Sequence, residues 1–102
     1  MSEQASSMSG AGAARAVTVR YWAAARAAAG TDKDVLEVNG DITLDQVLET
    51  VRLRHVDQPK FKDVVTVCSV LIGDRPVGTT DPAAVPVRPG DTVELLPPFA
   101  GG

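Results

Sequence analysis

Residues 43–55 carry the pattern that most restricts the fold of this chain. Thr43 precedes Gln46 by three residues, the spacing of a capping box, in which the two side chains bond free amides at the start of a helix. Apolar residues then recur at the helical positions i, i+3, i+4 and i+7: Leu44, Val47, Leu48 and Val51. In a chain of 102 residues, this amphipathic helix must bury its apolar side against a sheet built from the segments around it.

Alternating apolar and polar residues predict strands on both sides of this helix. The predicted strands are residues 16–22, 32–38 and 92–96, together with a β-branched central strand over residues 64–72. The alanine-rich run 23–29, followed by Gly30, predicts a short helix. Three prolines between residues 82 and 89 leave room only for short edge pairing there.

This order of elements predicts an α+β fold with the layout of the β-grasp, or ubiquitin-like, fold. The sheet is mixed, has about five strands, and is covered by one main helix plus a short helix. Residues 15–98 are expected to form this domain. Residues 1–14 are small and polar and are expected to be a disordered leader, and residues 99–102 a flexible Gly-Gly tail.

Composition excludes several classes of function. The formal net charge is −3, which argues against nucleic-acid binding, and no apolar run is long enough to span a membrane. A single cysteine excludes a disulfide framework and a zinc site built from several thiolates. Because the chain also has a single histidine, histidine and cysteine cannot form a chelating cluster. We interpret His55 as a solvated histidine at a helix end, and Cys68 as a small buried side chain within the central strand.

The last six residues are the part of the chain whose pattern points to chemistry. Pro97 and Pro98 fix φ and favour a tail that projects from the domain. The final two glycines lack side chains, so this thin end can enter a narrow channel in another protein. We predict Gly102 as the reacting residue. The predicted partner-binding residues of the tail are Pro98, Phe99, Ala100 and Gly101.

A carboxylate is a poor electrophile because it is anionic and resonance-stabilised at neutral pH. Chemistry at Gly102 therefore needs activation, most directly adenylation with ATP on a separate enzyme. A sulfur nucleophile that attacks the acyl-adenylate gives a thiocarboxylate, which can donate sulfur from a tethered position. The chain is thus expected to be non-catalytic alone and to bind no permanent cofactor, with sulfur held covalently at Gly102.

Three stretches carry a family resemblance. They are residues 19–30 (VRYWAAARAAAG), residues 43–48 (TLDQVL) and residues 89–102 (PGDTVELLPPFAGG). Over residues 16–102 the chain resembles the molybdopterin synthase small-subunit family, sulfur carriers of the ubiquitin-like superfamily. The most specific element is the first strand running into residues 22–26, which matches the family's Phe-Ala-x-x-Arg. The chain departs from the family at Trp22, where Phe is usual, and at Ala27, where an acidic residue is common.

This resemblance implies a cytoplasmic sulfur carrier for molybdenum cofactor synthesis. An E1-like adenylyltransferase/sulfurtransferase would adenylate Gly102 with ATP and load the sulfur. The tail would then insert into the large subunit of molybdopterin synthase, where cyclic pyranopterin monophosphate becomes molybdopterin. The complex implied is a heterotetramer of two small and two large subunits.

Three other functions stay open at this point. A sulfur carrier for thiamine or cysteine synthesis would use identical tail chemistry. A ubiquitin-like protein modifier would join Gly102 to a lysine of its target. A plain β-grasp interaction module would have an idle tail.

Overall fold

The computed structural model describes residues 15–98. In this range the chain forms seven strands, three α-helices and one short 3₁₀ helix. In chain order the elements are β1 (Ala16–Tyr21), α2 (Ala23–Ala29), β2 (Lys33–Glu37), β3 (Ile42–Thr43), α3 (Leu44–Arg54), α4 (Phe61–Val67), β4 (Ser69–Ile72), β5 (Arg75–Pro76), η1 (Pro82–Ala84), β6 (Pro86–Val87) and β7 (Thr92–Leu96).

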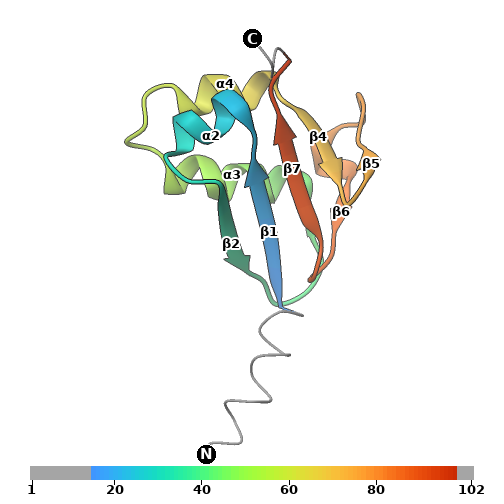
Figure 1. Cartoon of the computed structure of the whole chain (residues 1–102). Helices are drawn as coiled ribbons and strands as arrows, with labels where there is room; N and C mark the ends of the chain where they lie inside the picture. The colour runs from blue at the N-terminus through green and yellow to red at the C-terminus, as the bar shows by residue number, and fades with distance from the viewer. Residues whose placement is uncertain (1–14, 99–102) are drawn as a thin grey trace, which may run out of the picture.

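Five strands form one mixed sheet in the order β2-β1-β7-β4-β5. The central pair, β1 and β7, is parallel, with Val19 opposite Val93, and the other neighbouring pairs are antiparallel. In Figure 1, α3 lies behind this sheet, and α2 and α4 lie near its upper end. The predicted α+β, β-grasp architecture with a mixed sheet of five strands is therefore confirmed.

The alternation of the two central strands decides which face of the sheet holds the core. Their buried residues are Val17, Val19, Tyr21, Val93 and Leu95. The apolar side of α3 packs into the same cluster through the four residues predicted from its spacing: Leu44, Val47, Leu48 and Val51. One face of the sheet is thus covered, and no helix of residues 15–98 covers the other (Figure 1).

The start of α3 confirms the predicted capping box. The Gln46 amide donates to Oγ1 of Thr43 at 3.1 Å, and the Thr43 amide donates to Oε1 of Gln46 at 2.9 Å. Thr43 also pairs with Pro86 in the small sheet formed by β3 and β6. This short pairing is the kind predicted for the proline-rich segment, and it holds the beginning of α3 in place.

The segment predicted as one strand over residues 64–72 is divided in the structure, and that prediction is wrong for its first half. Residues Phe61–Val67 form α4, and only Ser69–Ile72 enter the sheet as β4. Phe61 and Val65 lie one helical turn apart, and both are buried. Their burial outweighs the modest preference of β-branched residues for strands. The described domain therefore has three α-helices where two were predicted.

The short helix α2 ends where the sequence predicted. Gly30 follows it with a φ of +75°, a left-handed conformation that favours glycine, and its amide donates to the Arg26 carbonyl oxygen at 3.0 Å. The chain then turns directly into β2 at the edge of the sheet.

Leu95 tests the contribution of the central strand pair to stability. Leu95→Ala is expected to lower the free energy of unfolding by about 2–5 kcal/mol, because it removes fully buried apolar atoms and leaves a cavity. The matched control is Leu53→Ala: Leu53 lies on α3 but is 63% exposed, so its loss should change stability by less than about 0.5 kcal/mol. Urea denaturation followed by circular dichroism measures both variants. Equal losses would contradict this assignment of the core.

Candidate functional site

The predicted reactive tail leaves the domain at the carboxyl end of β7. This strand lies between β1 and β4, so both of its edges are paired and the base of the tail is held in the middle of the sheet. Pro97 is buried, whereas Pro98 is exposed. Pro98, the first of the predicted partner-binding residues, therefore lies at the surface. The other predicted site residues lie outside the described residues: Phe99, Ala100, Gly101 and Gly102.

An aromatic and polar cluster lies beside the base of the tail. The Trp22 amide donates to the Leu95 carbonyl oxygen at 3.2 Å, which joins the ends of β1 and β7. The Trp22 indole N–H donates to Oε1 of Glu94 at 2.9 Å. The guanidinium carbon of Arg20 lies 5.1 Å from the indole centroid, a cation–π contact. Trp22 is nevertheless 38% exposed, so this cluster presents a large aromatic ring to solvent.

The turn from β1 into α2 is strained at Ala23, whose φ is +50°. A side chain makes this left-handed conformation unfavourable by about 1–2 kcal/mol. Such strain persists where surrounding contacts enforce it. Here the Trp22 amide bonds to Leu95, and the Trp22 carbonyl oxygen accepts from the Ala25 amide at 2.9 Å. The sequence gives no signal for this turn, because alanine favours the right-handed helix.

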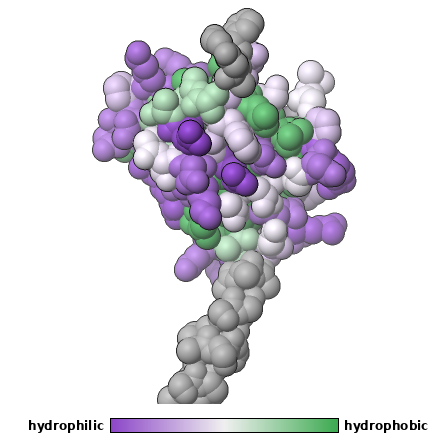
Figure 2. Space-filling view, in the orientation of Figure 1, coloured by the Kyte–Doolittle hydropathy of each residue, from purple (hydrophilic) through white to green (hydrophobic). Residues whose placement is uncertain are grey.

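The sheet face turned away from α3, called the open face below, is not covered by any helix of the part of the chain that the structure describes (Figure 1). The strand register assigns its outward-pointing residues: Lys33, Val35 and Glu37 of β2, Thr18 and Arg20 of β1, Thr92, Glu94 and Leu96 of β7, and Ser69 and Leu71 of β4. Figure 2 views this face and shows hydrophilic surface across its middle, with hydrophobic surface in its upper part. The base of the tail therefore lies beside an uncovered surface of mixed polarity.

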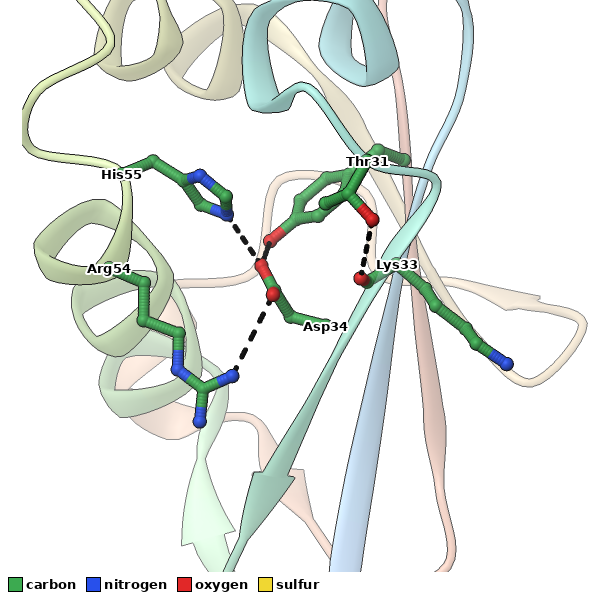
Figure 3. Close-up of polar contacts among 6 residues, drawn as sticks. Thr31, Lys33, Asp34, Arg54 and His55 are labelled. Carbon is green, nitrogen blue, oxygen red and sulfur yellow. Dashed lines mark hydrogen bonds and ion pairs between the residues drawn. The ribbon is translucent and has the colours of Figure 1, made fainter.

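His55 belongs to a polar cluster on the covered side of the sheet, so its interpretation as a solvated histidine is wrong. Its Nε2 lies 2.6 Å from Oδ2 of Asp34, and its side chain is only 12% exposed. The Tyr21 hydroxyl donates to the same oxygen at 2.6 Å, and Nη1 of Arg54 lies 3.6 Å from the other carboxylate oxygen. Figure 3 shows His55 and Arg54 pointing toward Asp34. Asp34 lies 21 residues away in the chain, so local sequence patterns could not pair it with His55.

Aromatic packing completes this cluster. The Tyr21 ring stands nearly perpendicular to the rings of His55 and Phe61, with centroids 5.8 and 5.5 Å away. His55 and Phe61 are 4.5 Å apart between centroids. Edge-to-face contacts of this kind stabilise aromatic pairs beyond the area they bury. The cluster thus ties β1, β2, the end of α3 and the start of α4 together.

The charges within this cluster are set by its geometry. Burial acts to raise the pKa of Asp34, but the hydrogen bonds with Tyr21 and His55, together with the electrostatic effects of His55 and Arg54, outweigh it, so the pKa lies below its usual value. Burial, followed by the hydrogen bond to Asp34, raises the pKa of Tyr21 far above its ordinary range. Asp34 is therefore ionised and Tyr21 is neutral at pH 7.

Cys68 lies at the carboxyl end of α4 and not inside a strand. It is half-buried, and its thiol donates to the Val64 carbonyl oxygen at 3.2 Å. Burial raises the pKa of Cys68 to about 11. Because the thiolate is the nucleophilic form, this thiol is poorly reactive at neutral pH. Its environment supports the interpretation of Cys68 as a packed side chain and not as a sulfur carrier.

A protein-family model matches most of the chain. The ThiS family model covers residues 19–102, from within β1 through all later elements of the domain. This chain belongs to the ThiS family. A comparison with curated proteins finds no match. The matched range includes both stretches on which the predicted resemblance depended most, the segment around Trp22 and the Gly101–Gly102 end.

Solved structures share the fold of the ThiS-family chain. A putative molybdopterin converting factor subunit 1 from Pyrococcus furiosus is 25% identical, with a TM-score of 0.66 over 81% of this chain and 97% of that one. SAMP1 from Haloferax volcanii is 20% identical, with a TM-score of 0.68 over 85% and 99%. A chain in the complex of subunits 1 and 2 of molybdopterin-converting factor from Helicobacter pylori is 23% identical, with a TM-score of 0.56 over 85% and 99%. These likenesses and the family match identify a ubiquitin-like protein of the sulfur-carrier type.

Residues 15–98 of the ThiS-family chain also bear on membrane and metal binding. None of the helices there is long and apolar enough to cross a membrane. Those residues also contain no group of three or more His, Cys, Asp or Glu side chains that could hold a metal ion.

The ThiS-family chain is expected to lose stability in acid through Asp34. Because the folded pKa of Asp34 lies below its ordinary value of 3.8, the charged carboxylate stabilises the fold above about pH 4, and this contribution is lost as the pH falls through the folded pKa. Asp34→Asn is expected to lower the free energy of unfolding by about 1–3 kcal/mol at pH 7, and the difference from wild type should shrink in acid. Urea denaturation at a series of pH values measures it.

The matched control for Asp34 is Asp57→Asn, because Asp57 is exposed in the segment between α3 and α4. Its replacement should change stability by less than about 0.5 kcal/mol at every pH. A difference between wild type and Asp34→Asn that stays constant from neutral pH into acid would show that the Asp34 charge does not stabilise the fold.

Proposed function

We propose that this ThiS-family chain carries sulfur for molybdenum cofactor biosynthesis as a thiocarboxylate on Gly102. The observation that carries the proposal is the continuous family match over residues 19–102, which joins the β-grasp domain and the Gly101–Gly102 end in one unit. The similarity to the putative molybdopterin converting factor subunit 1 from Pyrococcus furiosus supports this choice of pathway.

The base of the tail suits the delivery of a reactive group to another protein. β7 is paired along both edges, and the burial of Pro97 anchors the exit, while Pro98 is exposed. The four residues beyond Pro98 span at most about 13–14 Å when extended. A rigid base with a short extension lets the domain dock on a partner's surface while Gly102 reaches the partner's active site.

Loading of the tail needs a separate E1-like adenylyltransferase/sulfurtransferase. The Gly102 carboxylate attacks the α-phosphate of ATP, which releases pyrophosphate and forms an acyl-adenylate. A sulfur nucleophile then attacks the acyl carbon, the C–S bond forms, and AMP leaves with the electrons of the broken C–O bond. With hydrosulfide as the nucleophile, the product is the Gly102 thiocarboxylate itself. With a protein persulfide, the product is an acyl disulfide, and a second thiolate of the activating enzyme attacks the donor sulfur, so that the S–S bond breaks, the two enzyme sulfurs form a disulfide and the thiocarboxylate leaves. The chain alone catalyses none of these steps, and we propose that it holds no permanent cofactor.

The second proposed partner is the large subunit of molybdopterin synthase. The structural neighbour from Helicobacter pylori is a complex of subunits 1 and 2 of molybdopterin-converting factor, which supports a partnership of this kind. In the proposed heterotetramer the large subunit binds cyclic pyranopterin monophosphate and supplies the acid–base groups, and Gly102 supplies sulfur. We place this complex in the cytoplasm.

The alternatives differ in what receives the group on Gly102. A sulfur carrier for thiamine or cysteine synthesis uses the same loading chemistry, and the ThiS family match favours this alternative as well. A ubiquitin-like modifier forms an isopeptide bond with a target lysine. The likeness to SAMP1 at 20% identity supports only the fold that a modifier would share.

Intact-mass spectrometry tests the loading step. After incubation with the activating enzyme, ATP and a sulfur donor, the chain is expected to gain the mass difference between one sulfur and one oxygen atom. Cys68→Ser is the matched control and should gain the same mass, because the half-buried thiol has a raised pKa and is a poor nucleophile at neutral pH. Loss of the mass gain in Cys68→Ser would place the sulfur on Cys68, and higher-mass protein conjugates would favour the modifier.

A chain extended by one alanine after Gly102 tests the reacting group. The extension moves the terminal carboxyl beyond the second glycine and adds a Cβ atom where the tail must be thin. Molybdopterin formation from the precursor by the large subunit is expected to be lost, while the urea midpoint of the domain stays unchanged. Normal molybdopterin formation by the extended chain would contradict the proposal. If the loaded wild-type chain forms no molybdopterin but turns over in a thiazole assay, the chain belongs to thiamine synthesis.

A further inference from the structure

Trp22 is the one tryptophan of the chain, and its position is unusual for so large an apolar side chain. It is 38% exposed and lies on the open face of the sheet, where its amide is bonded to Leu95 at the end of β7. An exposed tryptophan beside the base of a reactive tail has the character of a binding anchor, because tryptophan is enriched among the residues that dominate protein–protein affinity.

Two neighbouring side chains hold the indole in one orientation. The indole N–H donates to the Glu94 carboxylate at 2.9 Å, and the Arg20 guanidinium carbon lies 5.1 Å from the ring centroid. Arg20 and Glu94 are direct cross-strand partners in the parallel pairing of β1 and β7. A hydrogen bond to a charged acceptor and a cation–π contact both depend on direction, so rotation of the indole breaks both of them.

The stability of the fold does not explain why Trp22 contacts Glu94 and Arg20. The hydrogen bond between Trp22 and Glu94 is exposed to solvent, and Arg20 is exposed as well. Contacts of this kind add little to stability because water competes for each group. A phenylalanine at position 22, which the family resemblance makes the usual residue, has no N–H to donate. The Glu94 contact is therefore tied to the indole of this chain.

We propose that Glu94 and Arg20 are positioning residues that hold Trp22 as a preformed anchor for the large subunit that receives the tail. The inference rests on the proposed function, because it names the surface through which that partner docks. Ordering a side chain before binding removes part of the entropy cost of association. We expect the recess that accepts the anchor to be apolar and of indole size, because Trp22 offers an exposed indole ring.

Sulfur transfer from the loaded chain to the pterin precursor, in the presence of the large subunit of the same organism, tests the anchor. Glu94→Ala removes the acceptor, and Trp22→Phe keeps an aromatic ring but removes the donor. Both are expected to raise the half-saturating chain concentration about three- to tenfold, the loss that follows from one unrestrained side chain, and to leave the rate at saturation unchanged. Glu94→Gln keeps an acceptor oxygen and should restore most of the affinity.

Glu37→Ala is the matched control, because Glu37 is an exposed glutamate on the same open face, on the edge strand β2. It should leave the half-saturating concentration unchanged. In the free chain, acrylamide should quench Trp22 fluorescence more strongly in Glu94→Ala than in wild type, because the indole is then free to rotate. Circular dichroism should show the same fold in every variant.

The outcomes separate this inference from the proposed function. If wild type transfers sulfur and neither Glu94→Ala nor Trp22→Phe raises the half-saturating concentration, the anchor is wrong and the carrier function stands. A rise for Trp22→Phe alone, with Glu94→Ala at the wild-type value, overturns the positioning role of Glu94. If wild type transfers no sulfur, the proposed function fails, and titration with the large subunit still decides the anchor: an unchanged Trp22 emission overturns it.

Discussion

The parallel pairing of β1 with β7 is the constraint on which the rest of the domain depends. Parallel strands cannot be joined by a tight hairpin, so everything between Tyr21 and Thr92 must cross over and return. The amphipathic helix α3 lies within this connection and covers the face that both strands fill with apolar side chains. The same pairing puts the last strand at the centre of the sheet, where both of its edges are bonded.

The central position of β7 provides a rigid support at the point where the tail begins. A strand bonded on both edges is the least mobile support that a small domain offers, and the tail begins where this strand stops. In the proposed carrier, the domain holds the tail in position and the tail supplies the reach into the partner's active site.

Two neighbouring residues show how one strand serves both faces of the sheet. Tyr21 points into the covered side, where its hydroxyl bonds to Asp34 beneath the ring of His55. Trp22 follows it and lies on the open side, bonded to Glu94. The alternation of the strand separates the two roles: the inner cluster ties helices to the sheet, and the outer one presents an aromatic ring beside the tail. The strained φ of Ala23 directly follows this pair.

Local patterns in the sequence determined most elements of this protein and the motif of its tail. The capping box at Thr43, the apolar spacing of α3, the alternation of β1 and β7 and the Gly30 stop depend on residues close together in the chain, so the structure confirms them. Tertiary structure decided the rest. Burial of Phe61 and Val65 turned half of a predicted strand into α4, and the contacts of His55 with Asp34 and of Trp22 with Glu94 join residues 21 and 72 positions apart. Such pairings follow from which strands lie side by side, and no local pattern in the chain records that.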